Sequence, residues 1–308
     1  MGNFVRDYVK SPLNYIGGKY KLLPQILPLF PENIRCFVDL FTGGCNVGVN
    51  IHAENIVCND NLTYLIDLYE IFQKTSVETV LKHVESRIKQ YSLSLTNQEG
   101  YLQLRNEYNS TRNPLDLFVL TAYSFNHQIR FNNNHQYNNP FGRQRSSFNE
   151  NMRKNLIRFV EKLHDLPIRF TRCDFTQFDC AQLGKNDFIY CDPPYLITTG
   201  TYNDGKRGFN GWGERDERNL LELLTNLDAK GVKFALSNVL YHKGKVNMIL
   251  ENWIMENNYT ISELNMSYFN SNYQTKDRNP SASQEILVTN YVPENYRHVL
   301  CIAEAQYV

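Results

Sequence analysis

The sequence has no net charge, no closely spaced cysteine pair and no long apolar run. Lysine plus arginine and aspartate plus glutamate both number 32, so overall charge neither supports nor excludes a nucleic-acid partner and local charge must decide. The first seven residues contain no apolar signal core, and no stretch approaches the ~20 apolar residues that span a bilayer. We therefore expect a soluble, cytoplasmic protein with no membrane partner.

The cysteines are odd in number, scattered, and never spaced as CxxC. Most lie in apolar, strand-like runs, which favours buried free thiols in a reducing compartment over zinc ligands. We therefore expect no metal site. The cysteines are Cys36, Cys45, Cys58, Cys173, Cys180, Cys191 and Cys301.

The remaining composition is that of a globular protein. The chain has 308 residues, of which 42% are hydrophobic and 13% aromatic, which is enough for a core and argues against disorder. Apolar strand-like runs alternate with helical periodicity, except that residues 65–130 are helical throughout. The pattern predicts an α/β protein with an insertion of helices. The predicted strands begin near residues 36, 55, 168, 187, 232, 260 and 285.

The most informative stretch is a predicted strand that runs into Asp192, Pro193, Pro194 and Tyr195. Residues 187–191 are mostly apolar, and prolines cannot continue a sheet ladder, so the strand must end at Asp192. A carboxylate, a carbonyl oriented by the stiff proline turn and an aromatic ring then share one strand end. Together they suit a flat molecule that carries an amino group. The alternative is a plain proline-terminated strand.

Two glycine-containing segments indicate close approach of backbone to a ligand. Gly17 and Gly18 permit a tight turn before a helical pattern that opens at Lys19, although a simple loop-to-helix junction looks the same. In the second segment, the strand from Cys36 runs into a glycine-rich turn, and we predict a helix over 47–53. This is the first βα unit of a Rossmann-like sheet, but the absence of GxGxxG disfavours a dinucleotide site.

A carboxylate, Asp60, follows the second predicted strand. An acid at this position is well placed to bind ribose hydroxyls. The alternative is an N-cap for a helix that starts near Leu62. The spacing after the first strand favours the ribose role.

Residues 125–143 are rich in amides, aromatics and arginines. Amide and arginine side chains hydrogen-bond to base edges, aromatic rings insert between bases or stack on them, and positively charged side chains bind phosphate. We therefore interpret this stretch as a nucleic-acid face rather than as an asparagine-rich loop of the kind that low-GC genomes encode. Between residues 126 and 158, Glu150 is the only acid, and the basic residues are Arg130, Arg143, Arg145, Arg153, Lys154 and Arg158.

Two further polar segments suggest roles of their own. Residues 196–212 are glycine-rich and predict a mobile lid. Residues 271–283 carry Lys276 and Arg278 and predict a phosphate contact.

These motifs, in this order along the chain, resemble the Dam-type adenine-N6 DNA methyltransferases, the D12 class or alpha group. The order is Gly-Gly-Lys, the glycine turn, the acid at strand two, a target-recognition insertion, and Asp-Pro-Pro-Tyr. The resemblance implies a Rossmann-like, mostly parallel sheet with an inserted recognition domain of helices and a hairpin, and S-adenosylmethionine as methyl donor. It divides the chain into a catalytic domain of residues 1–64 and 166–308 and a recognition domain of residues 65–165.

By position, the resemblance assigns roles to individual residues. Tyr15 and Lys19 fall near the methionine end of the donor, Asp60 at its ribose, and Asp192 at the edge shared with the target. Cys45 stands where the glycine turn of the family usually has its last glycine. Asp39, Phe41 and Gly43 complete the donor set.

The resemblance likewise places a set of DNA-contacting residues on the recognition hairpin and beside it. Asn14 stands where a Dam-type lysine reads an outer base, so the target sequence stays open and GATC is one option. The DNA-contacting set is Asn14, Phe125, Asn126, Arg130, Phe141 and Arg143.

The resulting expectation is a site-specific enzyme that methylates adenine N6 in double-stranded DNA after base flipping. It would act as a monomer, in a bacterial or phage setting, with a cognate restriction endonuclease that acts separately. The alternatives are methylation of cytosine N4, RNA or a protein amide, or a DNA-binding relative without activity. Amide methylation is typical of an asparagine where this chain has Asp192.

Overall fold

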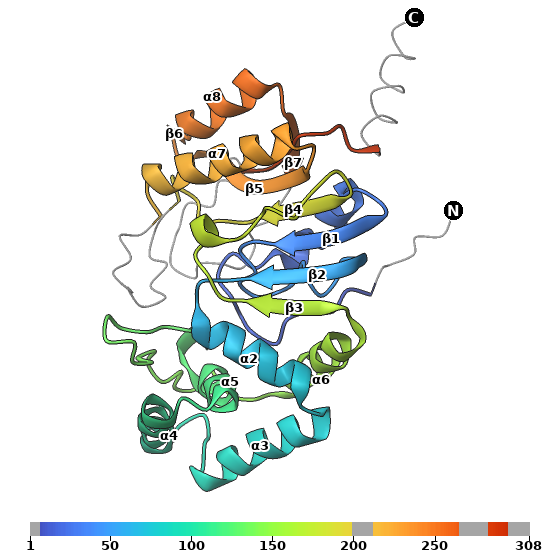
Figure 1. Cartoon of the computed structure of the whole chain (residues 1–308). Helices are drawn as coiled ribbons and strands as arrows, with labels where there is room; N and C mark the ends of the chain where they lie inside the picture. The colour runs from blue at the N-terminus through green and yellow to red at the C-terminus, as the bar shows by residue number, and fades with distance from the viewer. Residues whose placement is uncertain (1–6, 199–211, 265–282, 295–308) are drawn as a thin grey trace, which may run out of the picture.

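The computed structural model describes residues 7–198, 212–264 and 283–294. A single sheet with strand order β3-β2-β1-β4-β5-β8-β7 forms its centre (Figure 1). The first five of these strands pair in parallel, whereas β8 is antiparallel to both β5 and β7. The strands are β1 Ile34–Asp39, β2 Ala53–Asn59, β3 Ile168–Thr171, β4 Asp187–Cys191, β5 Lys233–His242, β6 Lys245–Val246, β7 Thr260–Leu264 and β8 Ser283–Thr289; β6 extends β5 as a short hairpin.

Alternate side chains of the central strands enter two separate cores, because successive strand residues point to opposite faces. Phe37 and Phe188 belong to one core, in which Phe30 packs edge-on against Phe188 with centroids 4.7 Å apart. Val38 and Ile189 belong to the other. Burial on both faces explains why these strands read as continuous apolar runs.

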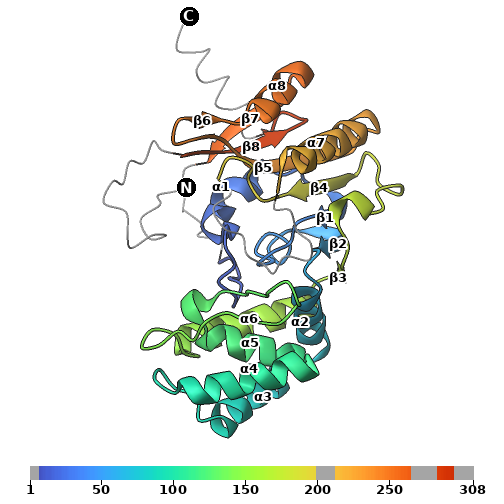
Figure 2. The same cartoon turned by 90° about the vertical axis from the view of Figure 1, so that its left-hand side faces the viewer.

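Helices cover both faces of the sheet and also extend beyond its β3 edge (Figures 1 and 2). The helices α7 and α8 cover the core that contains Val38, and α2 to α6 gather beyond β3. The helices are η1 Lys19–Leu22, α1 Leu23–Ile26, η2 Leu27–Leu29, α2 Thr63–Lys74, α3 Val77–Gln90, α4 Gln98–Thr111, α5 Pro114–Tyr123, η3 Phe125–His127, α6 Glu150–Asp165, η4 Phe175–Gln177, α7 Glu214–Ala229 and α8 Met248–Asn257.

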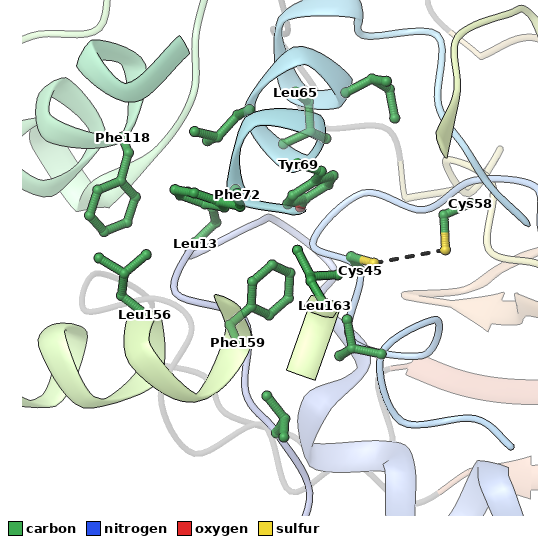
Figure 3. Close-up of a cluster of buried hydrophobic side chains, with 14 of the residues drawn as sticks. Leu13, Cys45, Cys58, Leu65, Tyr69, Phe72, Phe118, Leu156, Phe159 and Leu163 are labelled. Atoms are coloured by element: carbon green, nitrogen blue, oxygen red, sulfur yellow. Dashed lines mark hydrogen bonds between the residues drawn. The ribbon is translucent and has the colours of Figure 1, made fainter. Parts of the chain in front are cut away.

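One aromatic cluster connects the helices beyond β3 to the turn that follows β1 (Figure 3). The Phe72 ring packs edge-on against Phe118 of α5 and Phe159 of α6. One turn earlier on α2, the buried Tyr69 hydroxyl donates a 2.6 Å hydrogen bond to the carbonyl oxygen of Gly43. The core of the helical part therefore fixes the position of the glycine turn.

The predicted helix over 47–53 is wrong: this segment forms consecutive turns that lead directly into β2. Gly48 packs so closely against β2 that a Cβ would lie 2.4 Å from the Cys58 sulfur. The Asn46 and Asn50 side chains bond to the backbone of the N-terminal segment, which helps to hold the chain in this shape. These tertiary contacts override the helical pattern.

The other predicted elements are present, with shifted ends. The strand predicted over 168–175 stops at Thr171 and is followed by η4, whereas β5 continues to His242. The predicted lid over 196–212 and the loop over 271–283 fall almost entirely outside the described residues.

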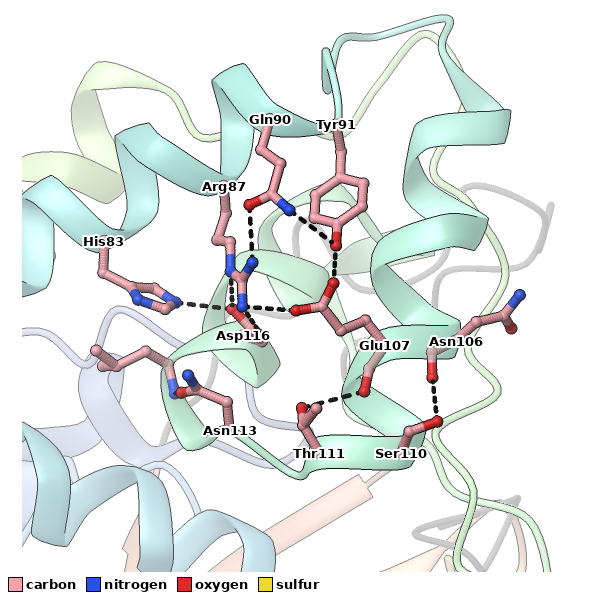
Figure 4. A network of polar contacts seen from close by, with 11 residues as sticks. His83, Arg87, Gln90, Tyr91, Asn106, Glu107, Ser110, Thr111, Asn113 and Asp116 are labelled. Carbon is pink, nitrogen blue, oxygen red and sulfur yellow. Dashed lines mark hydrogen bonds and ion pairs between the residues drawn. The ribbon is translucent and has the colours of Figure 1, made fainter.

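A buried charge network joins α3, α4 and α5 (Figure 4). The fully buried Asp116 carboxylate accepts hydrogen bonds from Arg87 Nε at 2.9 Å and Nη2 at 3.0 Å, and it contacts His83 Nε2 at 2.7 Å. Arg87 also reaches Glu107 at 2.8 Å. Because neither Asp116 nor Arg87 is well hydrated, each depends on its partners.

We predict that Asp116→Ala destabilises the protein by about 3 kcal/mol, because the change leaves the half-buried Arg87 without its main partner. Urea denaturation measures the effect. Glu150→Ala is the control, since its ion pair with Lys154 is exposed and should contribute under ~0.5 kcal/mol. Equal losses in the two variants would contradict the assignment.

Candidate functional site

A cavity of about 430 Å³ opens at the carboxyl ends of β1, β2 and β4. Strand order reverses between β1 and β4, and open α/β sheets bind ligands at such a switch point. The cavity brings together every residue predicted for donor binding and the first three of Asp-Pro-Pro-Tyr. Its lining includes Tyr15, Lys19, Asp39, Phe41, Gly43, Asp60, Asp192, Pro193 and Pro194.

The glycine turn after β1 forms one wall of the cavity. Gly43 has a φ of +44°, and a Cβ there would lie 2.9 Å from the Tyr15 ring, so only glycine fits without strain. Its N–H donates to Asp60 Oδ2 at 2.9 Å, while Asp60 Oδ1 accepts the N–H of Leu62 at 2.9 Å. Asp60 therefore braces the turn as well as facing the cavity. The helix α2 begins after Leu62, so Asp60 is not its N-cap.

Carboxylates dominate the charge of the cavity. Asp39 is almost fully buried, and its Oδ1 has no hydrogen-bond partner among the described residues. Burial, and next the negative charge of Asp192, raise the pKa of Asp39 well above its usual range. The lining of the cavity contains five aspartates, Asp39, Asp60, Asp174, Asp192 and Asp216, and one lysine, Lys19. This balance favours a ligand that carries positive charge.

Asp192 lies directly after β4 and forms an ion pair with a buried lysine. Lys19 Nζ lies 2.8 Å from Asp192 Oδ2, and it also donates to the Gly17 carbonyl oxygen at 2.9 Å. The Tyr195 hydroxyl lies 3.0 Å from Asp192 Oδ1. Burial raises the pKa of Asp192, and the positive charge of Lys19 opposes that shift. The carboxylate is thus held in place at the cavity edge.

Three aromatic rings form another wall of the cavity, and the sequence had not predicted two of them, Phe175 and Trp212, as site residues. The Trp212 ring lies 5.7 Å from Phe41 and 5.4 Å from Phe175, centroid to centroid. The Trp212 Nε1–H donates at 2.6 Å to Glu217, a buried carboxylate on α7. Burial raises the pKa of Glu217. A tryptophan at the end of the glycine-rich segment was the one signal that could have identified this wall.

The residues predicted to contact DNA lie outside the cavity, on and beside the 125–143 segment. Asn126 adopts a left-handed conformation with φ 56° and accepts a 2.9 Å hydrogen bond from Asn14 Nδ2 through its carbonyl oxygen. Phe125 is 41% exposed, and the Arg145 guanidinium lies 5.3 Å from its ring. The structure thus brings Asn14, Phe125 and Asn126 together.

The remaining members of that set differ in exposure. Arg130 and Arg143 are exposed. The Phe141 side chain is half-buried, and its ring lies 5.4 Å from that of Tyr101 on α4. Isolated bridges pair Ser124 with Phe141 and Phe131 with Tyr137, which gives the segment a hairpin shape. Phe141 therefore anchors the hairpin to the helices.

The described part of the chain holds no group of three or more His, Cys, Asp or Glu arranged to bind a metal ion. Its cysteines are free thiols, and Cys301 lies outside it. None of the helices in the described ranges is both long enough and apolar enough to cross a membrane.

Comparison with known proteins gives matches over most of the chain. The family model of the D12 class N6 adenine-specific DNA methyltransferases matches residues 15–273. The type II methyltransferase M.FokI of Planomicrobium okeanokoites is 53% identical over 92% of this chain, and the modification methylase StsI of Streptococcus sanguinis is 50% identical over 94%. The matches cover 43% and 44% of those proteins, so the chain spans less than half of their length.

A shorter relative matches across most of its own length. The DNA adenine methylase of Salmonella typhi is 31% identical over 232 residues, which make up 73% of this chain and 79% of that protein. The residues that the family model matches include the whole lining of the cavity and the strand that ends at Asp192. The chain therefore belongs to the D12 class N6 adenine-specific DNA methyltransferase family.

Proposed function

We propose that this protein transfers a methyl group from S-adenosylmethionine to the N6 amino group of adenine in double-stranded DNA. The observation that carries the proposal is the shared cavity, which unites Asp192 with Asp39, Asp60 and Lys19. An acceptor for an amino group and a site for a positively charged nucleoside thus share one space.

The residues of the cavity fit S-adenosylmethionine. When bound, this donor supplies a methyl group on a positively charged sulfur, and it also carries an ammonium group, a ribose and an adenine. The unpartnered Asp39 oxygen suits the ammonium group. Asp60 suits the ribose hydroxyls, and the wall of Phe41, Phe175 and Trp212 suits the adenine ring. Tyr15 and Lys19 would flank the methionine end.

Asp192 and the Pro193 carbonyl would act on the target base. The lone pair of adenine N6 is delocalised into the ring, so this nitrogen is a poor nucleophile. Two acceptors that bind its two hydrogens favour a pyramidal nitrogen whose lone pair points at the methyl donor. Transfer is direct, with no covalent enzyme intermediate. A base inside the duplex cannot reach Asp192, so the adenine must flip out of the helix.

The helices and hairpin of residues 65–165 would form the target-recognition domain, and residues 1–64 and 166–308 the catalytic domain. Arg130 and Arg143 are exposed and would contact phosphates or base edges. Asn14, Phe125 and Asn126 are exposed and lie together, and they would face the duplex. Phe141 would contribute to DNA binding indirectly, because it anchors the hairpin that carries most of the other residues.

Relatives named as modification methylases suggest the biological setting. We propose a cytoplasmic enzyme that acts as a monomer on DNA and protects it from a separate restriction endonuclease. Labelled methyl transfer to DNA, RNA and protein, with product analysis, distinguishes adenine N6 from cytosine N4 and from other amino groups. Donor binding without any transfer would identify a silent DNA-binding relative.

We predict that Asp192→Ala lowers methyl transfer to DNA by at least about a thousandfold, because it removes the main acceptor for the amino group. Donor affinity, measured by calorimetry, should change by less than about tenfold, since Asp60 and the aromatic wall remain. Asp165→Ala, a change at an exposed acid that ends α6, is the control. Full activity in Asp192→Ala would refute the mechanism.

We predict that Trp212→Ala weakens S-adenosylmethionine binding by roughly tenfold, because an aromatic contact contributes about 1–2 kcal/mol. Trp212→Phe keeps a ring in the wall and should retain most of the affinity. Calorimetric titration measures both. Unchanged affinity in Trp212→Ala would mean that the donor adenine lies elsewhere.

We predict that Arg130→Ala and Arg143→Ala each weaken DNA binding and reduce the salt dependence of log K by about one unit of slope if the arginine contacts a phosphate. If either reads a base, discrimination at one position should instead relax by about 1–3 kcal/mol. Fluorescence anisotropy across a salt series makes the measurement. Arg169→Ala, on exposed β3 surface, is the control; an equal effect there would argue against the hairpin.

A further inference from the structure

A second buried carboxylate, that of Glu285 on β8, contacts both Lys19 and Tyr195, the two residues that also contact Asp192. Its side chain is 1% exposed, and its Oε1 lies 2.8 Å from the Tyr195 hydroxyl and 3.4 Å from Lys19 Nζ. The same hydroxyl lies 3.0 Å from Asp192 Oδ1. Two carboxylates therefore share one phenol and one ammonium group.

The number of protons in this group decides which oxygen atoms remain acceptors. A phenol has one proton, so Tyr195 donates either to Glu285 or to Asp192 at any moment. Burial, and next the charges of Asp192 and Glu285, raise the pKa of Tyr195 well above its usual range, so this proton stays on the phenol. Lys19 donates to the Gly17 carbonyl oxygen and lies within ion-pair distance of both carboxylates.

Glu285 Oε1, at 2.8 Å, and Asp192 Oδ1, at 3.0 Å, compete for the phenol proton of Tyr195, and Glu285 can accept it in place of Asp192. In that arrangement Asp192 Oδ1 keeps its lone pairs available to a substrate. In the opposite arrangement the phenol proton occupies the oxygen that the target amino group needs.

We propose that Glu285 is a positioning residue for methyl transfer: it draws the Tyr195 hydroxyl and part of the Lys19 ammonium to itself, which keeps Asp192 Oδ1 open to the N6 amino group. This inference rests on the function proposed above. Glu285 is not among the residues that line the cavity, and it would act through Tyr195 and Lys19.

Packing alone does not account for an acid at this position. The next three residues of β8, Ile286, Leu287 and Val288, are apolar and fully buried. Burial of a carboxylate is unfavourable by several kcal/mol unless it is well paired. Lys19 is already paired with Asp192 at the shorter distance of 2.8 Å, so the second acid adds negative charge to a site that is already acidic.

The charge of Glu285 also gives the inference a pH signature. Asp192 is surrounded by Lys19 of η1, by Tyr195, by Glu285 of β8, and, on β1 and β4, by Asp39 and Tyr190. Among these, Glu285 contributes to the raised pKa of Asp192. Removal of its charge should lower that pKa, and because transfer needs the ionised carboxylate, activity should persist to lower pH.

The test compares the unaltered protein, Glu285→Gln and Glu263→Gln. Glu263 is an exposed acid on the neighbouring β7 that accepts a hydrogen bond from the Gln284 side chain, so its change is a matched control. Single-turnover methylation of plasmid DNA from a host without adenine methylation, with labelled S-adenosylmethionine, is followed from about pH 5 to pH 9. Calorimetry gives donor affinity in each case.

In Glu285→Gln, the amide oxygen can still face Tyr195 and Lys19, but it carries no charge and is the weaker acceptor, so the phenol proton shifts toward Asp192. We expect the plateau rate to fall roughly tenfold to a hundredfold, donor affinity to stay within about threefold, and the acid limb of the rate profile to move to lower pH. Glu285→Asp keeps the charge but shortens the reach, so it should slow transfer with the acid limb unmoved. If Glu285→Gln does not fold, a plateau rate in Glu285→Asp equal to that of the unaltered protein would by itself overturn the inference.

A plateau rate and acid limb in Glu285→Gln equal to those of Glu263→Gln would overturn the inference. A fall in rate with an unmoved acid limb would also overturn it, because it would show only a structural role. If the unaltered protein transfers no methyl group to any adenine, the proposed function fails together with the inference. If the unaltered protein does transfer methyl groups to adenine and only the results for the Glu285 variants differ from expectation, the inference about Glu285 is wrong and the proposed function stands.

Discussion

One buried ammonium group, that of Lys19, joins three distant parts of the chain. It comes from the first short helix and lies between Asp192, after β4, and Glu285, on β8. Inside a protein such charges interact strongly, and each becomes costly when a partner is lost. The cavity therefore assembles only when the N-terminal segment, the proline turn and the antiparallel end of the sheet are all in place.

The rest of the fold shapes the space around this ion pair. The aromatic core of α2, α5 and α6 fixes the glycine turn through Tyr69, and Asp60 braces that turn from β2. On the opposite side, Glu217 of α7 holds the indole of Trp212. The result is a pocket with acidic residues on one side and aromatic rings on another, which suits a cationic nucleoside such as S-adenosylmethionine and leaves the Asp192 edge for an amino group.

Local sequence features predicted the parts of this site that depend on local chemistry. The β4 strand was predictable from its apolar run, and its end at Asp192 from two prolines that cannot pair. The residues predicted to bind the donor share a cavity because parallel strands end at one edge. The helix predicted after the glycine turn was wrong, because close packing of Gly48 against β2 outweighs helical periodicity. Glu285 and Trp212 escaped notice since their roles depend on tertiary contacts; Glu285 meets a partner 90 residues away.

The most direct test of the account is a map of modified bases in the DNA of cells that express this gene. Methylation-aware sequencing reads both the chemical nature and the sequence context of each mark. The account predicts N6-methyladenine at one defined recognition sequence, and its absence when the gene is absent. DNA with no new mark, or with methyl groups only on cytosine N4, would contradict it.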